Sequence, residues 1–177
     1  LMLGYEIDLS VAAAFDLSGD AGPDYSQMDA HLYRYGADDA LFGIPTTGGF
    51  VGPLRFLGPS VFSHRALSTK IGWLRAGLLS KPKLLERVLL SPEGQTLEEL
   101  KRLTRGLIDA GVRVLTFSMH SPSAKPGCTP YTNTDEDVEA FTSLCRDYFQ
   151  FFRDEIGGIG TVPHEAMKRA KDVGFPL

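Results

Sequence analysis

The hydrophobic positions of this chain follow two periods that alternate along its length. Short or alternating apolar runs, bounded by Gly, Pro and Ser, predict strands over residues 5–11, 41–47, 87–90 and 112–120. Apolar residues at helical spacing predict helices over residues 63–79, from 97 to the glycine at 111, from 134 to the glycine pair at 157–158, and from 161 to 170. Residues 12–39 follow neither period, so we expect a long loop there.

This order of elements predicts an α/β fold, because strands that alternate with helices usually lie parallel beneath them. The 177 residues have the length of one domain or of a large piece of a bigger one, and no linker or repeat divides them. Two of the helices carry clear start signals. Thr96 and Glu99 have the spacing of a capping box, and Thr134 is followed by three acidic residues that suit a helix N-terminus.

The predicted strand over residues 112–120 carries the strongest chemical signal. Alternate side chains of a strand point to opposite faces, which places an apolar set (Leu115, Phe117, Met119) opposite an increasingly polar set (Val114, Thr116, Ser118, His120). The polar set ends in His120, at the carboxyl end of the strand, where α/β enzymes place catalytic groups. His120 is therefore a candidate acid or base. The alternative is a structural histidine bonded to a neighbouring loop.

Three further residues are candidates for binding or orienting a substrate. Tyr131 lies in a loop stiffened by prolines, and its flat ring and hydroxyl are typical of sugar-binding sites; an ordinary rigid turn is the alternative. Asp8 and Asp16 flank the end of the first predicted strand, where a carboxylate can orient a catalytic group or hold a substrate hydroxyl. Loop aspartates more commonly cap turns. The other histidines and the two cysteines show no metal-ligand spacing (His31, His64, His164, Cys128, Cys145).

Composition narrows the classes of partner. A hydrophobic fraction of 43% predicts a real core. A formal net charge of −4 without a basic cluster argues against nucleic acid. No apolar run approaches the roughly 20 residues that span a bilayer. The compartment and the oligomeric state stay open, with the cytoplasm slightly favoured.

Several runs of the sequence together resemble a known family. They lie at residues 4–11, 15–16, 22–24, 44–47, 90–94, 117–123 and 129–131, and those around His120 and Tyr131 are the most specific. In this order they resemble the C-terminal half of polysaccharide deacetylases with NodB homology, carbohydrate esterase family 4, and most closely the bacterial subgroup labelled WalW-like.

The resemblance implies a distorted (β/α) barrel of the glycoside hydrolase/deacetylase type. It also implies a hydrolase of carbon–nitrogen amide bonds that removes N-acetyl groups from a polysaccharide or oligosaccharide. In that family a divalent metal, zinc in our expectation, is held by an aspartate and two histidines and activates water. A neighbouring aspartate is the base, and a histidine at the end of a late strand donates a proton to the leaving amine. His120 matches that histidine, and Asp8 or Asp16 falls near the segment that orients the site.

The family's aspartate pair and His-x-x-x-His motif have no counterpart in residues 1–177. We expect them before Leu1, so the chain is interpreted as a single partial domain that carries the acid but neither the metal ligands nor the base. Such a half barrel is expected to be inactive alone. Two alternatives stay open: a non-catalytic glycan-binding or interaction domain of the same descent, and an amide hydrolase that acts on a small non-sugar substrate.

Overall fold

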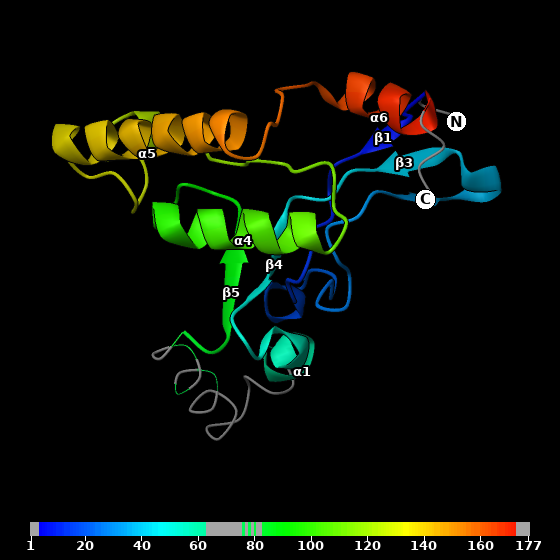
Figure 1. Ribbon diagram of the computed structural model, residues 1–177, viewed down its shortest axis with the longest axis horizontal. Helices are drawn as coiled ribbons and strands as arrows, with labels where there is room; N and C mark the ends of the chain where they lie inside the picture. The colour runs from blue at the N-terminus through cyan, green and yellow to red at the C-terminus, as the bar shows by residue number, and fades with distance from the viewer. Residues whose placement is uncertain (1–3, 63–75, 77, 79, 81–82, 173–177) are drawn as a thin grey trace.

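The computed structural model describes residues 4–62, 76, 78, 80 and 83–172, and their fold is mixed α/β (Figure 1). The strands are β1 (Ile7–Asp8), β2 (Tyr33–Tyr35), β3 (Leu41–Gly43), β4 (Gly48–Val51) and β5 (Glu86–Leu89). The helices are α1 (Gly58–Val61), α4 (Leu97–Asp109), α5 (Asp135–Asp154) and α6 (Pro163–Asp172). Short 3₁₀ turns follow the same order: η1 (Ser18–Asp20), η2 (Ala37–Asp39), η3 (Arg55–Leu57) and η4 (Ser121–Ala124). The helix expected over 63–79 lies almost entirely outside the described residues.

The strands form two small sheets, and parallel pairing occurs in only one strand pair among the described residues. In the first sheet, with order β1-β3-β2, β1 is parallel to β3 and β2 is antiparallel to it. In the second sheet, β4 and β5 are antiparallel. The expectation of a parallel sheet is therefore wrong for two of these pairs. The cause is that two strands were not predicted: β2 falls in the expected loop over residues 12–39, and β4 follows the predicted strand over 41–47. Each of them pairs antiparallel to its neighbour.

The main hydrophobic core lies between the second sheet and the helices α4 and α5. Its buried members come from β4, from β5 and the residue after it, and from the two helices (Val51, Val88, Leu90, Leu100, Leu103, Tyr148, Phe151). A second cluster packs α6 against the first sheet (Leu32, Phe42, Ile44, Ala166, Met167, Ala170). Figure 1 shows the same division, with α4 and α5 on one side of the molecule and α6 over β1 and β3 on the other.

Both predicted helix starts are confirmed. At α4, the Thr96 side chain accepts a hydrogen bond from the Glu99 amide, and the Glu99 carboxylate accepts one from the Thr96 amide at 2.7 Å. At α5, Thr134 and Asp137 form the same reciprocal pair, at 3.2 and 3.0 Å. Each box satisfies two backbone donors that the helix itself leaves free.

Residues 112–120, all of which the structure describes, do not form a strand, so that prediction is wrong. The segment is extended, but Thr116 N donates to the side chain of Thr47 at 2.7 Å instead of to a strand backbone. Ser118 N donates to Leu90 O at 3.1 Å, beside the end of β5. The predicted faces hold in part: Leu115 and Phe117 pack against the main core, whereas Met119 is 53% exposed.

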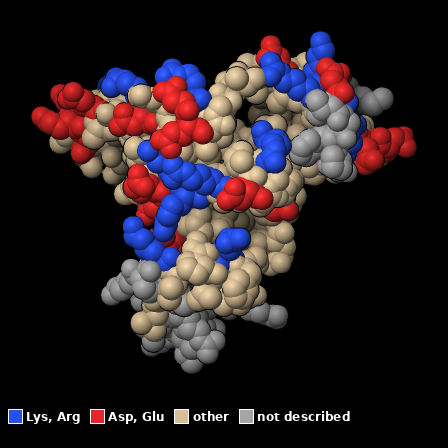
Figure 2. Space-filling model, in the orientation of Figure 1, with Lys and Arg blue, Asp and Glu red and all other residues tan. Residues whose placement is uncertain are grey.

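Charged side chains of both signs cover the face in Figure 2, where basic residues gather over α4. Lys101 and Arg105 both pair with Glu155 of the loop after α5, and Arg102 pairs with Glu86 of β5. These basic side chains therefore have acidic partners within the chain. Among the described residues, no helix is long and apolar enough to cross a membrane.

Candidate functional site

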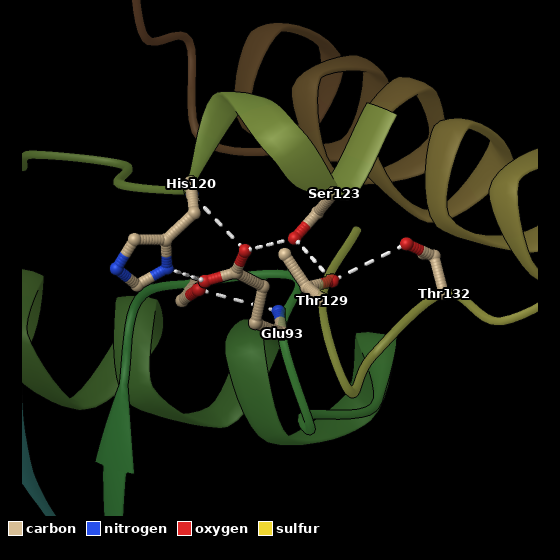
Figure 3. Close-up of polar contacts among 6 residues, drawn as sticks. Glu93, His120, Ser123, Thr129 and Thr132 are labelled. Atoms are coloured by element: carbon tan, nitrogen blue, oxygen red, sulfur yellow. Dashed lines mark hydrogen bonds and ion pairs between the residues drawn. The ribbon is translucent and has the colours of Figure 1, made fainter. Parts of the chain in front are cut away.

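The side chains around His120 come from three segments that meet beneath α5 (Figure 3). His120 is the residue just before the turn η4, and Pro122 within the first turn of η4 suits the start of a helical turn. Glu93 lies in the loop that joins β5 to α4. Thr129 and Thr132 lie in the loop between η4 and α5.

Glu93 holds His120 through two hydrogen bonds. His120 Nδ1 lies 2.7 Å from Glu93 Oε2, and the His120 backbone N donates to Glu93 Oε1 at 3.0 Å. The Glu93 side chain is only 6% exposed, whereas the His120 side chain is 75% exposed. Since an ionised carboxylate can only accept hydrogen bonds, Nδ1 of His120 carries a proton. The other ring nitrogen, Nε2, points away from Glu93 and is left for exchange with a ligand or solvent (Figure 3).

The electrostatics favour the ionised form of Glu93. Burial acts to raise the pKa of the Glu93 carboxyl, but hydrogen bonds from Ser123 and His120 stabilise the carboxylate and bring the net pKa below its ordinary value. A buried carboxylate that stays ionised can fix the orientation of an imidazole and stabilise its protonated form. This arrangement is typical of a histidine that transfers protons.

A row of hydroxyl groups continues behind the carboxylate. Ser123 Oγ donates to Glu93 Oε1 at 2.5 Å and lies 3.0 Å from Thr129 Oγ1. Thr129 Oγ1 lies 3.3 Å from Thr132 Oγ1. Ser123 and Thr132 are fully buried. The backbone of this loop is held as well, because Gly127 N donates to Thr132 O at 2.8 Å.

Tyr131 lies beside the same site. Its ring faces Gly94, the residue after Glu93, where a Cβ would lie 3.7 Å from Tyr131 Cε1. Gly94 has a φ of +75°, a backbone conformation that favours glycine. Tyr131 is 49% exposed. The structure therefore places Tyr131 next to the loop that carries Glu93, and its role in binding substrate stays a prediction.

Asp8 and Asp16 lie elsewhere. Asp8, at the end of β1, accepts hydrogen bonds from Ser10 N and from Tyr35 OH, both at 2.9 Å. Burial acts to raise the pKa of Asp8, but these bonds outweigh burial and lower it. Asp16 accepts from the backbone and hydroxyl of Ser18. These partners belong to the first sheet and its loops, so the carboxylate that contacts His120 is Glu93, and the predicted roles of Asp8 and Asp16 stay predictions.

Glu93 is a candidate site residue that the sequence analysis did not select, although a signal for it was present. It lies three residues after the short predicted strand over 87–90, and His120 is likewise at the carboxyl end of the segment 112–120. Under the predicted parallel α/β arrangement, in which strands bring their carboxyl ends to one edge, the rule that selected His120 also selects Glu93. The sequence analysis instead named Asp8 and Asp16, near the end of the first predicted strand, as candidates for the orienting carboxylate.

The described residues do not supply the metal site that the resemblance implies. Within residues 4–62, 76, 78, 80 and 83–172, no three His, Cys, Asp or Glu side chains gather in a way that would hold a metal ion. Cys128 is exposed and Cys145 is partly buried, with burial raising the pKa of the Cys145 thiol. The pair of Glu93 and His120, joined by a hydrogen bond of 2.7 Å, is thus the candidate chemical group on which the functional proposal is built.

Comparison with known proteins adds no relative: no family model matches the chain, and no curated protein or solved structure is significantly similar to it.

Proposed function

We propose that this chain carries the proton-transfer part of a hydrolase that removes N-acetyl groups from a polysaccharide or oligosaccharide. One observation carries the proposal: a buried carboxylate, Glu93, bonds to Nδ1 of His120 and leaves Nε2 exposed. The class of substrate is supported by the sequence resemblance around His120 and Tyr131. The alternative of a non-catalytic glycan-binding domain requires neither the ionised Glu93 nor the exposed Nε2.

In the proposed reaction, water adds through its oxygen to the acetyl carbonyl carbon and loses its two protons to solvent as acetate forms. The carbon–nitrogen bond breaks, and its electron pair stays on the nitrogen. The imidazolium of His120 donates its Nε2 proton to the departing amine nitrogen, which leaves acetate and a free amino sugar. The neutral imidazole that remains is reprotonated from solvent. Glu93 keeps the proton on Nδ1 throughout and stabilises the positive charge of the imidazolium.

In the family that the chain resembles, a divalent metal activates the attacking water. The described residues do not provide its ligands, so the proposal assigns no step to a metal in this chain. Tyr131, which is half exposed beside the Glu93 loop, is proposed to pack its ring against a sugar ring of the substrate.

The test is acetate release from oligomers of N-acetylglucosamine by the full-length protein. We expect His120→Ala to lower kcat about 10²- to 10⁴-fold, which is the usual contribution of a positioned acid or base. His31→Ala is the matched control, because His31 also pairs with a carboxylate, Asp29, at 2.9 Å but lies away from the site. The control is expected to keep the wild-type rate.

Two outcomes contradict the proposal. One is an unchanged kcat in His120→Ala. The other is binding of the oligomers by the wild-type protein without any release of acetate, which supports the glycan-binding alternative instead.

A further inference from the structure

The two oxygens of Glu93 have separate partners. Oε1 accepts from the His120 backbone N at 3.0 Å and from Ser123 Oγ at 2.5 Å, whereas Oε2 faces His120 Nδ1 at 2.7 Å. The two donors to Oε1 therefore fix the plane of the carboxylate. In that position, Oε2 is presented to the imidazole.

Ser123 is tied to His120 through the backbone as well. Ser123 N donates to His120 O at 3.0 Å, which closes the first turn of η4. The serine is fully buried, so water has no access to replace its hydroxyl at Oε1. Ser123 thus links the backbone that carries the imidazole to the carboxylate that orients it.

The hydrogen bonds among the hydroxyl groups of the site all run in one direction, from donor to acceptor toward Glu93. Ser123 must use its proton on Glu93, because an ionised carboxylate only accepts. Ser123 Oγ is then free to accept from Thr129 Oγ1 at 3.0 Å, and Thr129 in turn from Thr132 at 3.3 Å. Each hydroxyl that donates a hydrogen bond polarises the next hydroxyl toward Glu93, so the hydrogen bonds of the row strengthen one another.

We propose that the hydroxyl chain of Thr132, Thr129 and Ser123 positions Glu93 and thereby fixes neutral His120 in the tautomer with its proton on Nδ1. Ser123 is the main positioning residue, and the two threonines support it. The three hydroxyl groups thereby leave Nε2 of His120 without a proton in the neutral imidazole and available for proton transfer, a consequence that rests on the proposed function. The tautomer itself does not depend on any substrate.

The experiment is ¹⁵N NMR of the imidazole in the full-length protein at about pH 8.5, where an ordinary imidazole is neutral. The wild type is expected to show the Nδ1–H form in excess by about tenfold or more, since the bond to Glu93 is charge-assisted. In Ser123→Ala, the ratio of Nδ1–H to Nε2–H is expected to fall about three- to tenfold, the effect of one ordinary hydrogen bond on an equilibrium. Thr129→Val is expected to lower the same ratio by about twofold, because it removes only the second link.

Ser121→Ala is the matched control, because Ser121 lies in the same 3₁₀ turn but is exposed. Its ratio is expected to equal that of the wild type. An unchanged ratio in a folded Ser123→Ala overturns the proposal. If that variant does not fold, Thr129→Val decides alone, and an unchanged ratio there overturns the proposal equally.

The two proposals fail in distinguishable ways. A shifted tautomer ratio in Ser123→Ala together with no acetate release by the wild type refutes the proposed function and keeps the positioning role. Acetate release with an unshifted ratio keeps the function and refutes the positioning role.

Discussion

Truncation of Glu93 is expected to destabilise the fold although the residue lies in a loop. Glu93→Ala removes the acceptor of three hydrogen bonds, two at Oε1 and one at Oε2. The imidazole of His120 is 75% exposed and rehydrates after the change, so its bond contributes little to the cost. The buried hydroxyl of Ser123 and the His120 amide lose a charged acceptor. Each such bond is worth about 1.5–3 kcal/mol, and the desolvation cost of the removed charge is recovered, so we expect a net loss of about 2–4 kcal/mol.

Glu93→Gln separates the charge from the shape of the side chain. The amide oxygen still accepts from Ser123 and from the His120 backbone, so we expect a loss of only about 1 kcal/mol near neutral pH. The assay is urea unfolding followed by circular dichroism for the wild type and both variants, with a shared m-value as the criterion for comparing free energies.

The same variant tests the pH dependence. The pKa of Glu93 is depressed in the folded state relative to its ordinary value of 4.5. Its contribution to stability is therefore fully present above pH 4.5 and is lost as the pH falls through the folded-state pKa. The difference in unfolding free energy between wild type and Glu93→Gln should shrink over that acidic range. A loss below about 1 kcal/mol in Glu93→Ala, or a difference that does not change with pH, refutes this account of the buried carboxylate.

Two further predictions concern the packing that supports the site. Tyr148→Phe removes the buried hydrogen bond of 2.9 Å between Tyr148 OH and Thr104 Oγ1. We expect this change to lower the free energy of unfolding by about 1–3 kcal/mol. The double variant with Thr104→Val should lose less than the sum of the two single changes. Gly43→Ala is expected to destabilise by about 1–3 kcal/mol, because its Cβ would lie 2.2 Å from Cζ of Tyr33, and a neutral result in thermal unfolding contradicts this packing. Gly106→Ala is the opposite case: nothing lies within 4 Å of the new Cβ in α4, so about 0.5–1 kcal/mol of stabilisation is expected, and a loss contradicts it.

The helices were the part of the fold that the sequence predicted well. The starts of α4 and α5 depend on Thr96 with Glu99 and on Thr134 with Asp137, pairs only three residues apart. Interactions of this kind form within one turn, so neighbouring residues are enough to predict them. The apolar residues at helical spacing in α4 and α5 all face the core to some degree. Four of them are buried (Leu100, Leu103, Phe141, Tyr148), and the others are partly buried (Leu97, Leu107, Ile108, Val138, Cys145, Phe152).

The sheets were predicted less well because strand pairing joins distant segments. The run Gly48–Val51 was not predicted to be a strand, yet it forms β4 by pairing with β5, nearly forty residues later. Conversely, the segment 112–120 has the alternating pattern of a strand but does not form one. The backbone N of Thr116 donates its hydrogen bond to the side chain of Thr47 instead of to a neighbouring strand. A pattern of side chains describes which faces are apolar, and only a partner strand decides whether a ladder forms.

The candidate site shows the same division. His120 and the neighbouring Tyr131 could be selected from the sequence by residue type and by position after an extended run. That Glu93 orients His120, while Asp8 binds Tyr35 instead, was decided by the tertiary structure. Glu93 and His120 are 27 residues apart, and the loop after β5 meets the start of η4 only because α4 and α5 pack on a common core. Sequence neighbours determine which groups are chemically able to act, and long-range packing determines which of them meet.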